Sequence, residues 1–267
     1  RKLNDLYVQG RKSGLEAEEA LVDPLAVVLA SPGFLYLSEA EGADTKRRPL
    51  TLRELAVRLS YFLWSAPPDE ALYQVVKKGT LNNPDELTRQ VDRMLTDPRA
   101  EAFYHSFMSQ WFELHRFDDI AVNPDEYLMF DEQVRYSARE EPIRLFEHLV
   151  KENLSLGNLI DSDFAMLDPL LAHFYGIQGV DGQGFRKVNL PPESPRGGLI
   201  GTTAFMIMGS TGDRTSPIIR GTLVLDKFLH DPPADPPPNV PELTDASKDP
   251  LPVREMIELH QSKAQCA

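Results

Sequence analysis

Hydrophobic residues recur every three or four positions along most of the chain, which is the spacing of amphipathic α-helices. The clearest helix begins at Thr51-Leu-Arg-Glu54, a capping box in which the threonine and glutamate side chains accept bonds from backbone N–H groups. Pro67-Pro68 ends the pattern, because proline cannot continue a helix. Between these limits one face carries Leu52, Leu55, Leu59, Phe62 and Leu63.

Start and stop residues limit the other helices. Asp69, Asn83-Pro84 and Asp97-Pro98 each open a helix, and Gly176 closes one in the left-handed conformation that glycine adopts easily. Pro169 predicts a kink or an offset start in the helix that ends there. Besides the helix behind Thr51, helices are expected over about 15–30, 69–78, 83–95, 97–114, 131–152, 163–175, 198–209 and 217–229.

Only Phe185-Arg-Lys-Val-Asn-Leu190 alternates as a strand does, so a small hairpin is expected near 183–190. Twelve of the 22 prolines lie between Pro191 and Pro252, which predicts an extended strap near 230–252. These patterns indicate an all-α protein, a multi-helix globular bundle with at most that one hairpin.

The proline-rich stretch also gives the clearest boundary. A helical body is expected over residues 1–190, in which 1–45 ends a preceding module and 46–190 forms the main module. Two helices and the strap follow in 191–267. Because the chain lacks an initiator methionine and ends at Gln265-Cys266-Ala267, we expect a fragment or a processed product.

The chain is acidic, with 28 basic and 41 acidic residues and a net charge of −13. Nucleic acid and anionic lipid are therefore not expected as partners, because an acidic surface releases no counterions from them. No apolar run approaches the ~20 residues that cross a bilayer. The single cysteine, Cys266, excludes an internal disulfide and a multi-cysteine zinc site within the chain.

Two predicted helices each carry a glutamate and a histidine on one face. Glu101 and His105 are four positions apart, and Glu141 and His148 are seven apart. Di-iron bundles repeat Glu-x-x-His and zinc helices use His-Glu-x-x-His, so neither spacing fits a metal centre. For the pair four positions apart, Glu101 and His105, a surface ion pair is the expected role.

Three further acidic residues, Asp161, Asp163 and Asp168, lack the glycine and closing glutamate of an EF-hand loop. Helix capping by Asp161 or Asp163 accounts for them better. Gly209-Ser210-Thr211-Gly212 departs from Gly-x-Ser-x-Gly, so a turn between two helices is expected there, not a nucleophile.

Phe103, Phe107 and Trp111 form an aromatic stripe at helical spacing, which predicts a core face in preference to a cofactor pocket. Arg196 and Arg214 lie beside glycines and turns. We expect them to bond backbone carbonyls and so tie the strap to the body, with binding of an anion as the alternative.

The C-terminus carries the pattern that points to a cofactor. Cys266-Ala267 matches the first two residues of Cys-x-x-Cys-His, the motif that attaches a c-type haem through thioether bonds and binds its iron. Cys266 is therefore a candidate haem thioether and His260 a candidate neighbour of the haem. Most of such a site would lie outside this chain.

An ordered series of segments runs through residues 20–267. It consists of Leu29–Tyr36, Leu55–Asp69, Met94–Ala100, Phe107–Trp111, Leu171–Gly176, Arg196–Leu199, Arg214–Gly221 and Asn239–Pro241. In this order they resemble the large secreted planctomycete proteins of unknown function that carry planctomycete-type cytochrome c domains. In that family Cys-x-x-Cys-His often follows a stretch that Glu255–His260 resembles.

The resemblance implies a periplasmic or extracytoplasmic place and a haem-bearing neighbouring domain or redox partner, and it brings no known reaction. Three functions stay open. The first is a scaffold beside haem c in an electron-transfer or oxidoreductase component. The second is a cofactor-free binding or assembly module of a secreted complex. The third is a hydrolase domain that uses carboxylates such as Asp161 and Asp163.

Overall fold

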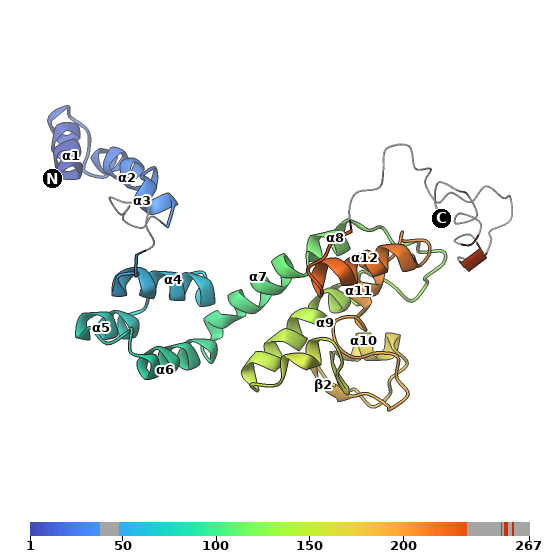
Figure 1. Cartoon of the computed structure of the whole chain (residues 1–267). Coiled ribbons are helices and arrows are strands. Elements are labelled where there is room, and N and C mark those ends of the chain that lie inside the picture. The colour runs from blue at the N-terminus through green and yellow to red at the C-terminus, as the bar shows by residue number, and fades with distance from the viewer. Residues whose placement is uncertain (38–47, 234–251, 253, 256–257, 259–267) are drawn as a thin grey trace. The chain divides into compact units, whose positions relative to one another are not determined.

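The computed structural model describes residues 1–37, 48–233, 252, 254, 255 and 258 (Figure 1). Helices make up most of these residues, and the named strands form one two-stranded antiparallel sheet. The predicted all-α class with a small hairpin is therefore confirmed. The chain divides into two compact units, the smaller formed by 1–58 with 68–84 and the larger by 59–67 with the residues from 85 onward. The domain division at residue 190 stays a prediction.

All the secondary-structure elements described in the smaller unit are helices. Its first helix was not expected from the sequence, and the predicted helix over 15–30 is wrong in its first half, where Gly14 has a positive φ and a short 3-10 turn follows. The first helix packs against that turn and against the next helix. The elements are α1 (Lys2–Lys12), η1 (Glu19–Leu21), α2 (Val22–Leu29), α3 (Pro32–Leu35), the start of α4 (Leu52–Trp64) and α5 (Glu70–Lys78).

The predicted helix starts in this unit are confirmed by their caps. The Thr51 N–H donates to the Glu54 carboxylate at 2.8 Å, and the Glu54 N–H donates to the Thr51 hydroxyl at 3.2 Å. These are the two reciprocal bonds of a capping box. At α5 the Asp69 carboxylate accepts from the N–H of Leu72 at 3.0 Å, so local side-chain chemistry fixes both helix starts.

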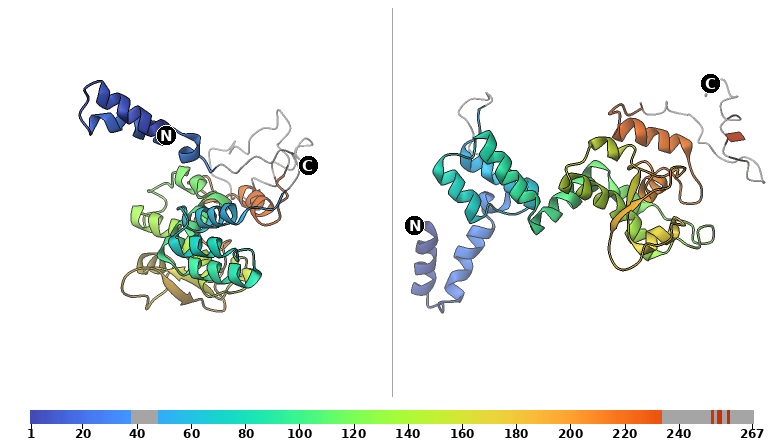
Figure 2. Two further views of the ribbon diagram at one scale, coloured as in Figure 1. Left: turned by 90° about the vertical axis from the view of Figure 1, so that its left-hand side faces the viewer. Right: turned by 90° about the horizontal axis from the view of Figure 1, so that it is seen from below.

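The larger unit is built around α9 (Glu132–Lys151), which packs against three further helices, one strand and a 3-10 turn of its own unit (Figures 1 and 2). Its largest fully buried side chains include Tyr104, Phe112, Phe117 and Phe205. The other elements are α6 (Pro84–Leu95), η2 (Pro98–Ala100), α7 (Glu101–Trp111), α8 (Leu114–Asp119), η3 (Leu156–Leu159), β1 (Phe164–Leu167), α10 (Pro169–Phe174), β2 (Arg186–Asn189), α11 (Thr203–Met208) and α12 (Pro217–Lys227).

The predicted helix over 163–175 is wrong in its first half, where β1 pairs with β2 in the register Phe164↔Asn189 to Leu167↔Arg186. All four residues of β1 are buried. A short apolar run buried on both faces shows no alternation, so its periodicity cannot separate a strand from a helix. The expected offset start at Pro169 is confirmed, because α10 begins there.

Asp168, not Asp161 or Asp163, is the capping residue, so that expectation is wrong. One oxygen of Asp168 accepts from the Leu171 N–H at 2.8 Å and starts α10, while the other accepts from the Ser137 hydroxyl of α9 at 2.6 Å. Asp161 and Asp163 are exposed. One carboxylate thus both caps α10 and joins it to the central helix.

We predict that Asp168→Ala lowers the free energy of unfolding by about 2 kcal/mol, because it removes a helix cap and the partner of a buried hydroxyl. Chemical denaturation followed by circular dichroism measures the change. Asp163→Ala is the control, since the Asp163 side chain makes no bond within the described residues, and it should change stability by less than about 0.5 kcal/mol. Equal effects of both substitutions would refute the role of Asp168.

The remaining expectations on this unit have mixed outcomes. The predicted helix over 198–209 is shorter, because α11 starts at Thr203 after a turn with positive φ at Gly197 and Gly198. The helix over 217–229 is confirmed as α12. The strap expected near 230–252 lies almost wholly outside the described residues.

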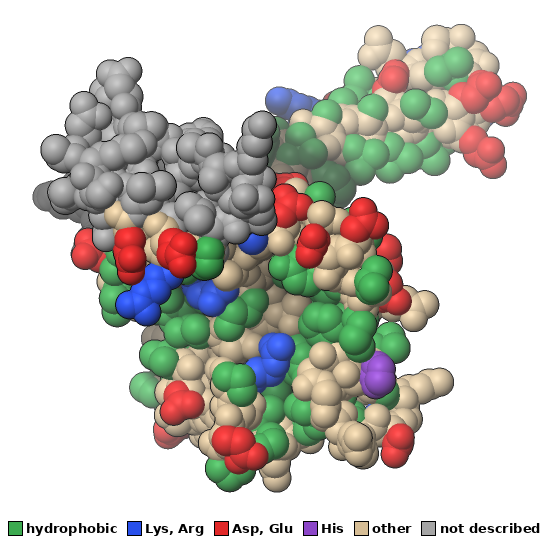
Figure 3. Space-filling view, turned by 90° about the vertical axis from the view of Figure 1, so that its right-hand side faces the viewer, with side chains coloured by type: hydrophobic (Ala, Val, Ile, Leu, Met, Phe, Trp, Pro, Cys, Tyr) green, Lys and Arg blue, Asp and Glu red, His purple; other side chains and the backbone are tan. Residues whose placement is uncertain are grey.

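On the face shown in Figure 3, hydrophobic side chains gather over the middle of the larger unit and acidic side chains lie mostly toward its edges.

Candidate functional site

The two residues proposed for haem attachment, Cys266 and His260, lie outside the described residues. Their role stays a prediction. The described part of the larger unit offers three other places where polar or aromatic side chains converge. These are a charged groove along α9, a buried carboxylate with a cavity beside it, and an aromatic groove on α7.

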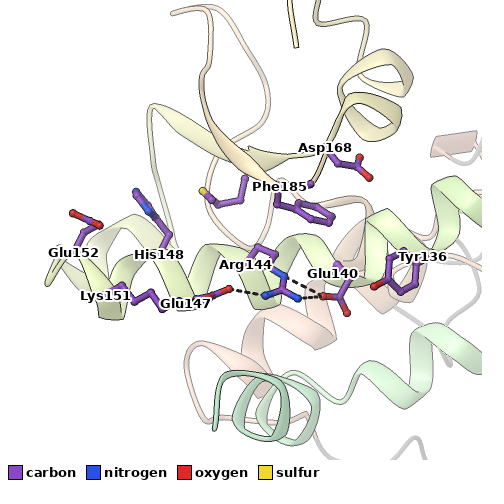
Figure 4. Close-up of a pocket in the computed structure, with 11 residues that line it drawn as sticks. Tyr136, Glu140, Arg144, Glu147, His148, Lys151, Glu152, Asp168 and Phe185 are labelled. Atoms are coloured by element: carbon purple, nitrogen blue, oxygen red, sulfur yellow. Dashed lines mark hydrogen bonds and ion pairs between the residues drawn. The ribbon is translucent and has the colours of Figure 1, made fainter. Parts of the chain in front are cut away.

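The charged groove has a volume of about 630 Å³ and follows α9 beneath the hairpin (Figure 4). Arg144 lies at its centre and forms ion pairs with Glu101 at 2.6 Å, Glu140 at 2.9 Å and Glu147 at 2.8 Å. His105 contacts Glu101 at 3.0 Å, so the predicted pairing of these two residues is confirmed. The cluster therefore joins α7 to α9 through one shared guanidinium.

The opposite charges of this groove pair with one another. Arg144 donates hydrogen bonds to all three carboxylates. Within residues 1–37 and 48–233 and the few described beyond them, no group of three or more His, Cys, Asp or Glu could hold a metal. His148 packs edge-on against the Phe164 ring with centroids 5.4 Å apart, and Glu141 bonds to Tyr175.

Glu141 is a fully enclosed carboxylate, with 2% of its surface exposed. It accepts from the Tyr175 hydroxyl at 2.5 Å and from the Thr203 N–H at 3.3 Å. Burial raises the pKa of Glu141 from 4.5 to about 7, against the opposing effects of these two bonds and of Arg196. Burial and the Glu141 carboxylate likewise raise the pKa of Tyr175 well above its ordinary value.

Arg196 covers this buried group. Its guanidinium lies 3.4 Å from the centroid of the Tyr175 ring, a cation–π contact, and donates to the Gly201 carbonyl at 3.1 Å. This bond to a backbone carbonyl is local, and the expected tie of the strap to the body by Arg196 and Arg214 stays a prediction. The arginine thus screens the Glu141–Tyr175 pair and lines the cavity next to it.

That cavity, here called the Arg196 pocket, has a volume of about 220 Å³. Most of its wall is apolar, and it lies between α10, α11, α12 and the loop at 122–130. The turn expected at 209–215 forms one side, with Ser210 bridged to Thr215. The lining residues are Val122, Tyr127, Phe130, Phe174, Arg196, Thr203, Met206, Ile207, Ser210, Gly212, Thr215 and Arg220.

The aromatic stripe on α7 is only partly a core face, so the prediction of a buried stripe is wrong for its outer side. Phe107 stacks on the buried Phe146 with centroids 4.8 Å apart, yet 37% of its surface is exposed. Phe103 and Trp111 extend the row on either side of it. With Phe62, which is 61% exposed, they line a groove of about 460 Å³.

Comparison with known families identifies two successive domains. Residues 50–177 match PSD4, a protein of unknown function (DUF1592), and residues 196–267 match PSCyt3, a protein of unknown function (DUF1588). Both are planctomycete cytochrome c-associated domains, and the chain belongs to this family of unknown function. No curated protein and no solved structure matches the chain.

Proposed function

We propose that the chain is the scaffold region of an extracytoplasmic c-type-cytochrome-associated protein that takes part in electron transfer or in an oxidoreductase. The observation that carries the proposal is the PSCyt3 match over 196–267, because it takes in both His260 and Cys266. Cys266 is the thioether attachment point in this proposal, and His260 is a neighbour of the haem. The protein's part is to set the ligation and burial of the haem.

Within the residues that the structure describes, the aromatic groove supports this proposal. Phe62, Phe103, Phe107 and Trp111 follow one another in ring contacts, and Trp111 meets Phe228 with centroids 6.2 Å apart. Phe228 caps the end of α12, the last helix before the segment that leads to Cys266. A partly exposed aromatic row that ends at Phe228 is a suitable contact surface for an apolar haem edge.

Haem attachment is tested with a pyridine haemochrome spectrum of the full-length protein, produced in a host that matures c-type cytochromes. We expect a c-type α-band that survives acid–acetone extraction. Cys266→Ala should leave one vinyl group unreacted and so move the band to longer wavelength, whereas the matched Ser262→Ala variant should keep the parent spectrum. A colourless parent protein would overturn the proposal.

The second function is a cofactor-free binding or assembly module, and the exposed aromatic groove favours it as well. Exposed aromatic side chains that line one groove are typical of surfaces that contact other proteins. Within the described ranges, no helix is long and apolar enough to cross a membrane. A colourless full-length protein that still binds a partner through the groove would establish this second function. The third, hydrolase, reading gains no support, because Asp161 and Asp163 line none of the three cavities described above.

A further inference from the structure

We propose that the Arg196 pocket binds a small organic monocarboxylate, whose carboxylate lies between Arg196 and Arg220 and whose apolar body fills the rest of the cavity. The proposal is independent of haem attachment. It assigns a ligand site to the body of the protein, in a volume of about 220 Å³ that is below the range of drug-sized ligands.

Arg220 provides the first argument. One of its terminal nitrogens donates to the Thr215 hydroxyl, but its Nε–H is buried and has no hydrogen-bond partner among the described residues. A buried donor without an acceptor is costly, and native structures rarely keep one without a reason. A carboxylate is the acceptor that matches the fork of a guanidinium, so a bound anion would satisfy Arg220.

Charge provides the second argument. Neither Arg196 nor Arg220 forms an ion pair with a carboxylate among the residues that the structure describes, although Arg144 in the charged groove has three. Arg196 acts electrostatically on the Glu141 carboxylate, but that carboxylate is bonded to Tyr175 and Thr203 instead. Two guanidinium groups on one small cavity therefore favour an anion.

Two hydroxyl groups of the pocket provide the third argument, because they have already donated their protons. Ser210 donates to the Ile207 carbonyl at 2.7 Å, and the Thr203 hydroxyl donates to the Tyr175 oxygen at 2.9 Å. The donors that remain are the N–H groups of the arginines and the hydroxyl of Thr215, which accepts a bond from Arg220. A ligand that only accepts hydrogen bonds at its polar end suits this site better than one that must also donate.

The walls select an organic anion over an inorganic one. Apolar and aromatic side chains line much of the cavity, among them Phe130, Phe174 and Met206. A strongly hydrated phosphate gains nothing from such walls, whereas a hydrocarbon body is transferred from water into an apolar site. The shape is also held firmly: the Asn123 N–H donates to the Gly212 carbonyl at 3.2 Å, and the Tyr127 hydroxyl donates to the Asp213 carbonyl at 3.2 Å.

Isothermal titration of the chain with benzoate tests the proposal, with benzamide and inorganic phosphate as comparison ligands. We expect saturable 1:1 binding of benzoate and at least ten-fold weaker binding of benzamide, which has the same shape without the charge. Phosphate should also bind at least ten-fold more weakly than benzoate. Equal binding of benzamide, tighter binding of phosphate, or no saturable binding of benzoate would overturn the proposal.

Arg220→Gln should weaken the binding of benzoate at least ten-fold. Arg220→Lys keeps the charge but loses the forked pair of guanidinium donors, and it should weaken the binding less. The matched control is Arg186→Gln, because the Arg186 Nε is also buried without a partner but Arg186 lines no part of this pocket. The control should bind benzoate as the parent does. A circular dichroism spectrum like that of the parent shows that each variant is folded. Unchanged affinity in both Arg220 variants would contradict the assignment.

Discussion

Replacing Gly198 by alanine should lower the free energy of unfolding by at least about 4 kcal/mol, a large effect for the addition of one methyl group. Gly198 has φ +59°, and an added Cβ would lie 2.4 Å from the Ile160 carbonyl oxygen and 2.8 Å from that of Leu159. The obstacles are backbone atoms, which cannot move aside as the end of a side chain does. The turn that contains Gly198 would have to move away from the backbone of Leu159 and Ile160 at the end of η3.

Gly176→Ala is the control for this prediction. Gly176 also has a positive φ, of +73°, but an added Cβ would meet nothing within 4 Å. Only the conformational strain then remains, which costs about 1 kcal/mol. Urea denaturation of both variants measures the difference. Similar losses in the two proteins would show that strain, and not the close approach of Gly198 to Ile160, decides the need for glycine.

Glu141→Gln should remove a pH dependence of stability worth about 3 kcal/mol between pH 4.5 and pH 7. Because the pKa of Glu141 is about 7 in the folded chain and 4.5 in the unfolded one, the folded state holds its proton more tightly. Stability from this group is therefore fully present below pH 4.5 and is lost as the pH rises to 7. Glutamine is neutral throughout and imitates the protonated acid.

The measurement is the change in unfolding free energy from pH 4.5 to pH 8 in the parent and in Glu141→Gln. Other groups titrate alike in both proteins and cancel in the comparison. The parent should lose about 3 kcal/mol more than the variant over this interval. Glu132→Gln, at an exposed position in the first turn of the same helix, should behave as the parent does. Equal losses in parent and Glu141→Gln would contradict the assignment of Glu141.

Helix starts could be predicted from the sequence because they depend on neighbours within four residues. Thr51, Asp69 and Asp97 all accept bonds from N–H groups at most three positions ahead. The first strand could not be predicted in the same way. Phe164–Leu167 is a short buried apolar run, and its partner strand begins 19 positions later at Arg186. Nothing local distinguishes such a strand from a turn of helix.

The candidate sites were harder to predict because their residues come together only in the fold. The sequence singles out Glu141 only by its spacing to His148, but its partners Tyr175 and Thr203 are 34 and 62 positions away. No sequence pattern indicates a role for Arg220, although it belongs to the segment Arg214–Gly221 that carries part of the family resemblance. Its place on the same cavity as Arg196 depends on how α12 packs against α11, which no sequence pattern states.

The measurement that tests the central claim most directly is peptide mass spectrometry of the full-length protein after maturation in a host that assembles c-type cytochromes. The account predicts that the peptide containing Cys266 carries the added mass of one haem. An unmodified Cys266 peptide, recovered from a protein whose folded body is intact, would contradict haem attachment at this residue and leave the binding or assembly module as the function of the chain.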